Sequence, residues 1–536
     1  MRTARRLSQS VSELFLRTDR SLTDGLHWID YTIIALYACG MLGIGWFYGR
    51  RQSNTEEYFV GNRAMPPLLI GISLFATLFS TITYLATPGE IIKHGPATLC
   101  GVLAIPLAYY LVGYLLVPVY MRNRVTSAYE LLEVRLGLRA RMVGAVLFIL
   151  LRLIWMALLI FLASKALLAM IGLDESELIY VIALTGGVAV GYSSIGGLRA
   201  VVITDLLQFL LLFGGMLLVL FMVTLRMGGF EWVPTEWNSS WDSQPVWPTS
   251  PTIRVTVVGS IIHGALWWFC TAGGDQTAVQ RFMATKDASA ARRSFLFNSI
   301  AGAAVNIALV FVGFALLGYY QADPSRLPQD PAVAARADLW FPYFISHHLP
   351  IGLSGLIVSG MFAAAMSSLD SGTNSITAVV MTDFVGRFRS QPPSPTAQVR
   401  LASSIAVLVG VTVITVSAFM RHVPGNFLEM SQRTQGLVVV PIFVLFFMAL
   451  FVPRSTEIGA LAACIASMVT AVLVAYWKQL AEAVLWMIRG SSEEFDPLSF
   501  QWINPVSLAV GVAVGWIVSL ASRALLGEPS SGSPSE

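Results

Sequence analysis

The segment 351–382 is rich in oxygen-bearing side chains for an otherwise apolar stretch. Seven of them fall within nine positions: Ser367, Ser368, Asp370, Ser371, Thr373, Asn374 and Ser375. A hard cation such as sodium takes oxygen ligands. Ser367 and Ser371 are four positions apart and would share one face of a helix. The pattern favours a cation site; the alternative is hydrogen bonding between helices that the neighbouring small residues allow to pack closely.

Two further apolar segments contain features that interrupt a helix. The segment 66–88 carries Thr77, Thr81 and Thr83 before a Pro-Gly pair, and hydroxyls can satisfy carbonyls that an unwound turn leaves free. The alternative is that these hydroxyls bond back to their own helix. The segment 253–275 ends in two glycines, an aspartate and then a glutamine. Interrupted helices in corresponding positions of two halves are typical of transporters built from inverted repeats, with the binding site between them.

Charged residues inside apolar segments are costly and point to function. Asp205 near the start of one segment requires a partner or a cation if it is buried, or it is an interfacial acid paired with Arg199. Arg152 lies near the middle of the segment 140–172, and its planar guanidinium matches a carboxylate. It suggests an anionic substrate, or else a structural pair with an internal acid. Arg433 either has a similar role or extends to the outer interface.

The composition indicates which elements must position these side chains. The chain has 536 residues, 55% hydrophobic and 12% charged, with a mean hydropathy of +0.68. Soluble domains carry roughly 25% charge, so the composition excludes a soluble enzyme and a nucleic-acid-binding module. A net charge of +3 indicates no polyanionic partner, and nothing indicates an obligatory protein partner. The apolar residues come in blocks of about 20, each long enough to cross a bilayer as a helix.

We therefore predict an all-α polytopic membrane protein with about 13 transmembrane helices. The spans fall near 28–49, 66–88, 97–120, 140–172, 178–195, 200–226, 253–275, 294–320, 351–382, 399–420, 425–451, 457–477 and 501–522. The last ten residues are rich in Ser, Gly and Pro, which predicts a disordered C-terminal tail.

Lysine and arginine counts in alternate loops predict the orientation. One set of loops carries 18 of these residues, Arg281 among them, and the other set carries 8. Positively charged loops stay in the cytoplasm, so we expect the N-terminus outside and the C-terminus inside the plasma (inner) membrane. Five arginines in the first 20 residues oppose this assignment. They would fit a short amphipathic helix on the membrane surface.

Five stretches between residues 73 and 383 carry a family resemblance: SLFATLFSTITYLATPGEIIKHG, TSAYELLEVRLG, YSSIGGLRAVVITDLLQ, GGDQTAVQRFMATKDASAARRS and FAAAMSSLDSGTNSITAVVMTD. Together they resemble the sodium:solute symporter family, and in particular its anion, monocarboxylate and sialic-acid branches. The resemblance implies a LeuT-type fold of two inverted five-helix repeats. The organisation expected is a tail (1–27), an extra helix and loop (28–64), the first repeat (65–226), an outer loop (227–252), the second repeat (253–451), two additional helices (452–522) and a C-terminal tail (523–536).

The resemblance also implies the ion ligands. The sodium site shared across the family looks like the carbonyls of Ala76, Phe79 and Ala364 with the hydroxyls of Ser367 and Ser368. Some members bind an additional sodium through an aspartate and a serine that match Asp205 and Ser371. At the intervening serine position this chain has Asp370, whose carboxylate would strengthen cation binding or create a different site.

The positions similar to family substrate contacts are Thr77, Thr81, Thr83, Arg152, Asp275, Gln276 and Gln432. Arg152 resembles the arginine that anchors the carboxylate in sialic-acid symporters, and the TPGE ending of segment 66–88 is similar to the branch that carries small anions. The expected function is therefore sodium-coupled import of a small organic solute that bears a carboxylate, by alternating access. The alternative within transport is a sodium-coupled sugar or polyol symporter.

A membrane-embedded enzyme is the alternative from another class. The sequence contains no HExxH pattern, and the stretch before Asp275 lacks the first Gly of the GxGD pattern of membrane aspartyl proteases. We expect no enzyme activity. A channel is disfavoured because two interrupted helices are a transporter feature.

Overall fold

The computed structural model describes residues 26–49, 63, 65–123, 125, 127–242, 250–388, 394–420, 427–489 and 498–526. All regular elements within these ranges are helices. The predicted N-terminal tail up to residue 25, almost all of the loop 50–64 and the last ten residues lie outside the described residues.

The first half of the chain contains an entry helix, an interrupted helix and three long helical segments. The elements are α2 (Trp28–Gly49), α4 (Pro67–Leu78), α5 (Thr81–His94), η2 (Pro96–Ala104), α6 (Ile105–Tyr110), η3 (Leu111–Leu116), α7 (Val117–Asn123), α8 (Glu130–Arg135), α9 (Leu138–Ile171), η4 (Glu175–Glu177) and α10 (Leu178–Arg226).

The second half repeats the pattern of an interrupted helix followed by long helices, and adds three more helices at its end. The elements are α11 (Val257–Gly274), α12 (Gln276–Met283), α13 (Ala288–Ala322), η5 (Pro324–Arg326), α14 (Pro331–Ala334), η6 (Ala337–Leu339), α15 (Trp340–His347), α16 (Leu353–Val379), η7 (Val380–Val385), α17 (Gly386–Phe388), α18 (Pro395–Ser417), α19 (Phe427–Phe451), α20 (Glu457–Ala475), α21 (Trp477–Arg489), η9 (Phe500–Trp502) and α22 (Ile503–Leu526).

Among the described residues, 11 helices are long and apolar enough to cross a membrane, or 12 when the bent pair α4 and α5 counts as one span. The predicted number of 13 is therefore not confirmed. The difference lies at 178–195, which falls within the 49-residue helix α10 and is not counted as a span of its own. The polytopic all-helical class itself is confirmed.

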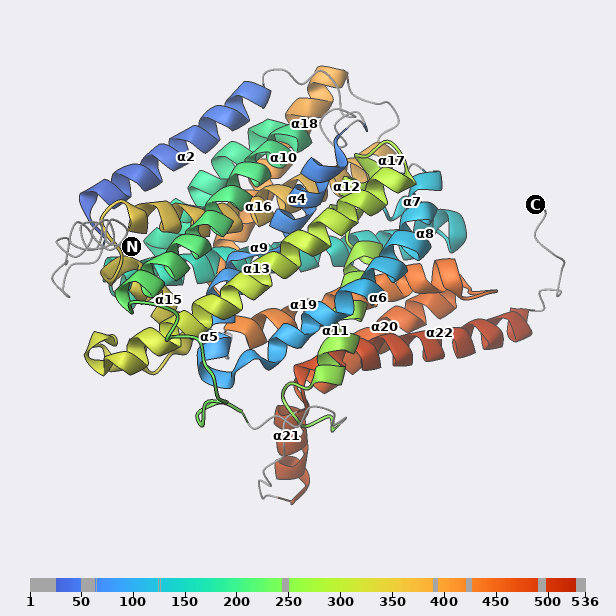
Figure 1. The fold of residues 1–536 in the computed structure, drawn as a ribbon. Coiled ribbons are helices and arrows are strands. Elements are labelled where there is room, and N and C mark those ends of the chain that lie inside the picture. The colour runs from blue at the N-terminus through green and yellow to red at the C-terminus, as the bar shows by residue number, and fades with distance from the viewer. Residues whose placement is uncertain are drawn as a thin grey trace.

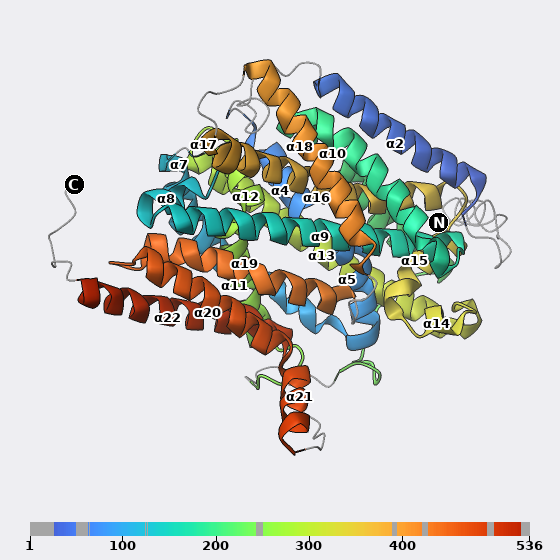
Figure 2. The same ribbon diagram turned by 180° about the vertical axis from the view of Figure 1, so that it is seen from behind.

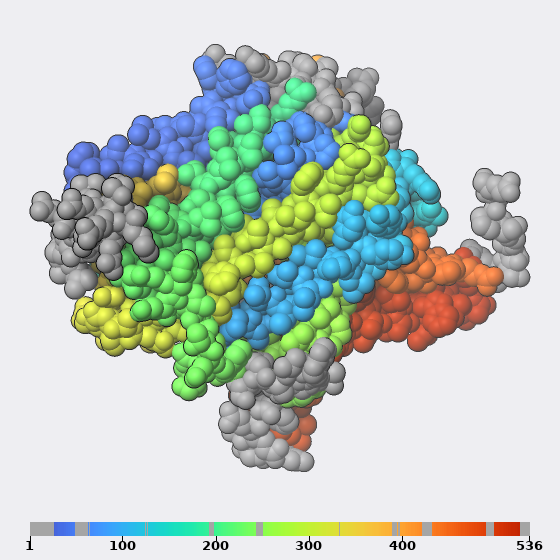
Figure 3. All heavy atoms as spheres, in the orientation of Figure 1, coloured from blue at the N-terminus to red at the C-terminus, as the bar shows by residue number. Residues whose placement is uncertain are grey.

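Helix α16 lies at the centre of the bundle (Figure 1). Every residue from Ile357 to Val379 is buried, and α16 packs against α2, α4, α9, α10 and α18. The helices α20 and α22 run side by side at one edge, far from α2 (Figures 1 and 2). On the face drawn in Figure 3, α10, α13 and the segment 96–123 lie as adjacent diagonal bands. The polar residues of α16 are thus placed as far from lipid as the fold allows.

The outer surface of the bundle is apolar, as a bilayer requires. Leu36, Leu184, Leu408, Ile465 and Ile517 are each more than 60% exposed, and they come from five different helices. An apolar surface of this extent is unfavourable in water and favourable against lipid tails. The described helices therefore form a membrane-embedded bundle whose largely apolar core contains clusters of buried polar residues.

Candidate ion and substrate site

The first interrupted helix breaks at Phe79 and Ser80. Both residues are extended, α4 ends one position before them, and the axes of α4 and α5 differ by 65°. The Phe79 amide still donates to the Phe75 carbonyl. A helix end leaves carbonyls in its last turn without intrahelical partners, so this break presents backbone oxygens inside the bundle.

Helix α16 is hydrogen-bonded to both halves of this broken helix, through serine hydroxyls to α4 and through a backbone carbonyl to α5. The Ser368 hydroxyl donates to the Thr77 carbonyl at 3.0 Å, and the Thr77 and Ser371 hydroxyls lie 2.7 Å apart. The Thr81 hydroxyl donates to the Met361 carbonyl at 3.2 Å. Thr77 and Thr81 are buried and bonded to α16, so neither lines a described cavity.

The five residues implied for the shared sodium site are all buried: Ala76, Phe79, Ala364, Ser367 and Ser368. Ser368 reaches the break directly, because its partner is the carbonyl of Thr77. The Ser367 hydroxyl instead donates to the Asp205 carboxylate. The two neighbouring serines therefore serve two adjacent polar sites, one at the break and one around Asp205.

The polar site around Asp205 already holds a positive charge, which sequence reasoning assigned to a loop. Arg281 in α12 is fully buried, and its guanidinium lies 3.6 Å from an Asp205 carboxylate oxygen. It donates to the Ser73 hydroxyl at 3.0 Å, to the Thr277 carbonyl at 3.1 Å, and also to the Ser371 hydroxyl. Arg281 is therefore a core residue, and the prediction that counted it among the cytoplasmic loop arginines was wrong.

Asp370 is the carboxylate next to the predicted ion ligands of α16. It is fully buried, one position before Ser371. Asn374, one turn further along α16, is also buried. The extra carboxylate that distinguishes this chain thus lies beside the predicted ion ligands, on another face of the same helix.

The second interrupted helix breaks at the single extended residue Asp275, between α11 and α12. Its side chain caps α12 by accepting from the Thr277 amide at 2.9 Å. The carbonyls of Gly273 and Gly274, just before the break, accept hydrogen bonds from Tyr120 and Tyr129. A Cβ atom at Gly274 would come within 3.1 Å of the Phe443 backbone nitrogen, which is tighter than most Cβ contacts, so the absence of a side chain favours the close packing there.

Arg152 reaches this second break from α9. Its guanidinium forms a bidentate ion pair with Asp275 and also contacts the Thr277 hydroxyl. Both charged side chains are at most 5% exposed. One of the two interpretations of Arg152 was a structural pair with an internal acid, and that pair is present. The acid, Asp275, is itself a predicted substrate contact.

The remaining predicted substrate contacts are less closely associated with the Arg152–Asp275 pair. Gln276 is buried, and its amide oxygen accepts from the Ala128 amide at 2.7 Å, away from the cavities. Thr83 lines the main cavity. The side chain of Gln432 lies outside the described residues.

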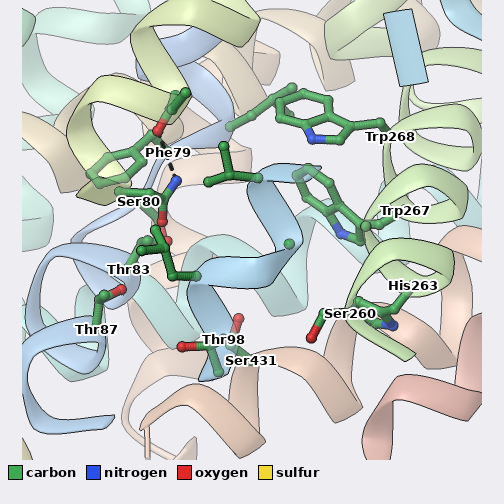
Figure 4. A pocket seen from close by; sticks show the side chains of 18 of the residues that line it. Phe79, Ser80, Thr83, Thr87, Thr98, Ser260, His263, Trp267, Trp268 and Ser431 are labelled. Atoms are coloured by element: carbon green, nitrogen blue, oxygen red, sulfur yellow. Dashed lines mark hydrogen bonds between the residues drawn. The ribbon is translucent and has the colours of Figure 1, made fainter. Parts of the chain in front are cut away.

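The main cavity has a volume of about 270 Å³ and lies beside the first break. In Figure 4, Ser260, His263, Trp267 and Trp268 of α11 face Ser80, Thr83 and Thr87 across it. A smaller cavity of about 20 Å³ contains Arg152 and Asp275 in its wall. The two cavities share four lining residues: Leu78, Trp155, Trp267 and Gln435. The smaller cavity, with the Arg152–Asp275 pair in its wall, therefore adjoins the main cavity.

Sequence reasoning missed the residues that line the boundary between the two cavities. The Trp267 indole donates to the Gln435 side chain at 3.0 Å, and the Gln435 amide donates to Ser431 at 3.1 Å. The polar run that contains Gln432 also contains Ser431 and Gln435, so it could have indicated them. Trp155 gave no signal, since an aromatic residue in a span usually packs against lipid or other helices.

The opposite end of the bundle is closed by a network of charges. Arg141 donates to both Glu133 and Asp383 at 2.7 Å, and Arg387 donates to Glu133 at 2.9 Å. These hydrogen bonds lower the pKa of Glu133. The network joins α8, α9, η7 and α17, whereas the main cavity lies toward the end of the bundle where α5 finishes (Figure 1). The two ends of the molecule thus differ: one contains the main cavity and the other contains the charge network.

An all-helical membrane bundle in which two interrupted helices meet at buried polar sites is the architecture of a secondary transporter with inverted repeats. The family model described as "Sodium:solute symporter family" matches residues 58–467. The chain belongs to the sodium:solute symporter family and is a sodium-coupled solute transporter, as its motifs predicted. The membrane-enzyme alternative is set aside, because this family consists of transporters.

The relatives include carriers of organic anions. The chain is 28% identical over 466 residues to the sodium/sialic acid symporter SiaT of Proteus mirabilis, covering 84% of this chain and 90% of that protein. It is 28% identical over 476 residues to the human sodium-coupled monocarboxylate transporter 1, covering 86% and 75%.

Solved structures agree with the expected LeuT-type fold. A Na⁺-coupled sialic acid symporter in a substrate-bound outward-open state matches 92% of this chain and 97% of that chain, with a TM-score of 0.75 and 27% identity. A nucleobase-cation-symport-1 family transporter, MHP1, matches 88% and 94% with a TM-score of 0.51 and 11% identity, which shows the shared fold alone.

Proposed function

We propose that this protein imports a small organic solute bearing a carboxylate, driven by sodium. The observation that carries the proposal is the position of Arg152 in the wall of the smaller cavity, which adjoins the main cavity. A buried arginine fork is well suited to bind a carboxylate through two parallel hydrogen bonds. The sialic-acid and monocarboxylate carriers among the relatives support an anionic solute.

Asp275 occupies the position that a solute carboxylate would take. In the present arrangement Arg152 is satisfied by the Asp275 carboxylate. A solute carboxylate that takes the Nε and Nη2 donors of Arg152 would replace Asp275, and binding would then free Asp275 at the break between α11 and α12. Solute binding would thereby loosen the second interrupted helix at the point where the two halves of the transporter must move.

Sodium would bind at the first break, where Ser368 meets the Thr77 carbonyl. A cation there would be held by carbonyls of Ala76, Phe79 and Ala364 together with the serine hydroxyls of α16. It would fasten α4 to α16 and hold the first interrupted helix in the shape that lines the cavity. Sodium would thus stabilise the outward-facing arrangement in which the solute enters the cavity, so that binding of the ion favours binding of the solute, which is the basis of coupling.

The energy available depends on the charge that crosses the membrane. A tenfold sodium gradient supplies about 1.4 kcal/mol per ion. A membrane potential of 100 mV supplies about 2.3 kcal/mol per net charge. One sodium with one monoanion carries no net charge, so it would use the chemical gradient alone.

The distribution of lysine and arginine supports insertion in the plasma (inner) membrane with the N-terminus outside and the C-terminus in the cytoplasm, and Arg281 is not needed for that bias. The described chain begins in α2 near the side marked N and ends in α22 on the opposite side, marked C (Figure 1). The charge network around Arg141 would then face the cytoplasm, and the main cavity would face outward.

Thermal stability of the purified protein, in sodium against potassium, tests the function. The ligands are N-acetylneuraminic acid, pyruvate, glucose and myo-inositol, with the methyl ester of N-acetylneuraminic acid as a matched control that lacks the carboxylate charge. We expect stabilisation by an acid, only in sodium and not by the ester. Stabilisation by glucose or inositol alone would replace the proposal by a sugar or polyol symporter. No sodium effect with any ligand would reject the sodium site.

A further inference from the structure

Helices α20 and α22 form an antiparallel pair, and α21 belongs to the segment that connects them. At the far end of the pair, the Thr456 amide donates to the Ser519 hydroxyl at 3.2 Å. At the near end, Ala475 at the end of α20 and Ile503 at the start of α22 share one buried apolar cluster. Both helices are long and apolar enough to cross a membrane. The segment that contains α21 therefore stays at one membrane surface.

That surface is at the end of the bundle where the main cavity lies. The short helix η9 directly precedes α22, and its residues Phe500 and Gln501 line the main cavity. Helix α21 extends away from the bundle at this end (Figures 1 and 2). It has 13 residues, whereas a membrane span needs about 20 residues. Helix α21 is therefore too short to be a further span.

The side chains of α21 separate into an apolar face and a polar face. Four large apolar side chains recur at the three- and four-residue spacing of one helix face and are between 37% and 73% exposed: Trp477, Leu480, Val484 and Ile488. The opposite face carries Lys478, Gln479 and Glu482. The Lys478 ammonium lies 3.8 Å from the Glu482 carboxylate. The bundle thus leaves the apolar face of α21 uncovered, and such a row of side chains is unfavourable in water.

The apolar face of α21 directly follows a surface of α20 that faces lipid. Val472 and Leu473, in the last turn of α20, are 39% and 48% exposed. Trp477 follows Leu473 by four positions and opens α21. Because α20 crosses the bilayer and ends at its surface, the lipid that covers Val472 and Leu473 is also within reach of α21.

We propose that α21 binds the phospholipid interface at the cavity end of the protein. Its axis would lie along the membrane plane, with the apolar face about 5–10 Å deep, at the boundary between headgroups and acyl chains. Lys478 and Glu482 would lie among the headgroups. Trp486 is on the polar face, and tryptophan is enriched at headgroup level. The proposal goes beyond the proposed function and does not depend on it.

The binding would come from the apolar face, because the opposite charges of Lys478 and Glu482 offset each other. A zwitterionic lipid such as phosphatidylcholine should therefore be sufficient, and anionic lipid should not be required. The anchored helix would fix the level of the cavity end of α20 and α22 relative to the bilayer.

Nitroxide labels on the full chain in phosphatidylcholine vesicles test the proposal without sodium or solute. Cys39→Ala and Cys100→Ala remove the two accessible native cysteines, and the other two are buried. Val484→Cys then carries a label on the apolar face, and Gln479→Cys carries the matched label on the exposed polar face. Oxygen concentrates among acyl chains, whereas a nickel chelate stays in water. We expect faster relaxation by oxygen at position 484 and by the chelate at position 479.

Any other pattern overturns the proposal. Preference for the nickel chelate at both positions would place α21 in water, and preference for oxygen at both would place it in the hydrocarbon core. Protection of position 484 from both reagents would show that protein covers the apolar face, for example a second copy of this chain.

A pair of charge variants tests whether the apolar face is the anchor. With the label at position 488 through Ile488→Cys, Val484→Glu should abolish the preference for oxygen. Gln479→Glu adds the same charge on the opposite face and should leave that preference unchanged. Both positions are exposed, so neither variant disturbs the core. Equal behaviour of the two variants would contradict the proposal.

Discussion

The Ser368 hydroxyl donates a hydrogen bond to the carbonyl of Thr77 at 3.0 Å, and 291 positions separate the two residues in the chain. The bond joins the central helix α16 to the last turn of α4, where the first helix is interrupted. It brings a hydroxyl oxygen and a backbone carbonyl oxygen to one point in the interior. The proposed sodium site depends on this contact.

Replacing Ser368 by Ala should weaken sodium binding about tenfold to a hundredfold, because a ligand to a charged group is worth about 1.5–3 kcal/mol. The measurement is the sodium concentration that gives half of the thermal stabilisation. Ser359→Ala is a matched control, since Ser359 is also buried in α16 but bonds only to its own helix through the Gly355 carbonyl. Unchanged sodium affinity in Ser368→Ala would rule out the site at the break.

The sequence was sufficient to predict most of the fold because bilayer thickness imposes a length that apolar segments report directly. The two interruptions were also predictable. Hydroxyls around Thr77 and the two glycines before Asp275 are local signs of an unwound helix. The number of 13 spans was not confirmed, and the predicted span at 178–195 lies within α10, which runs from 178 to 226.

Contacts between distant segments could not be predicted in the same way. Arg281 follows the stretch Asp275–Gln280, in which four of six residues are polar, and therefore resembled the start of a loop. Only the short helix α12, which remains inside the bundle, places its guanidinium beside Asp205. The partner of Arg152 depended likewise on how α9 packs against the break at Asp275, which a pattern along one segment does not specify.

Removing the negative charge at position 275 should separate the two roles of Arg152, which are pairing with Asp275 and binding the carboxylate of a solute. Asn at position 275 can still cap α12, since Asn and Asp are comparable caps. It no longer competes as an anion, so Asp275→Asn should bind a carboxylate solute about tenfold more tightly than wild type. Calorimetric titration in sodium, with whichever acid stabilises the wild-type protein, measures the change.

Arg152→Ala removes the other member of the pair, the positive charge. It leaves the buried Asp275 carboxylate without its partner, which typically costs about 3–5 kcal/mol of stability. The double variant Arg152→Ala with Asp275→Ala should recover much of that stability but bind no acid. Retention of acid binding by this double variant would show that the carboxylate is held elsewhere.

His348 should make the folded state sensitive to mild acid. It lies between α15 and α16, with its ring nitrogens near the Tyr319 hydroxyl at 3.3 Å and the Arg326 carbonyl at 3.1 Å. Burial lowers the pKa of His348 from 6.5 to about 4. The unfolded chain therefore takes up a proton as the pH falls below about 6.5, while the folded protein does not until about pH 4.

The contribution of His348 to stability is thus complete above about pH 6.5 and decreases as the pH falls toward 4, by up to about 1.4 kcal/mol per pH unit. Melting temperatures from pH 7.5 to pH 5 measure this slope. In His348→Gln the loss of stability over the same range should be smaller. Identical slopes for the two proteins would show that other groups account for the acid sensitivity.

The charge network at the end opposite the main cavity should hold the transporter in its present arrangement. Asp383 is fully buried, accepts from Arg141 at 2.7 Å and also accepts from Ser127 at 2.6 Å. Asp383→Asn removes the charge that fixes Arg141, so the closed end should open more often. Because the arrangement with the outer cavity is the one that would bind sodium, apparent sodium affinity should fall by about 5- to 150-fold, the usual range for such coupling.

Hydrogen exchange of the amides in α8 and α12, measured with a sodium titration on the same samples, reports both effects. Arg387→Gln is the control, because the Arg387–Glu133 pair is about one-third exposed and a surface pair is worth about 0–1 kcal/mol. We expect faster exchange and weaker sodium binding in Asp383→Asn and little change in Arg387→Gln. If Asp383→Asn changes neither quantity, the network stabilises the fold without controlling which end of the transporter is open.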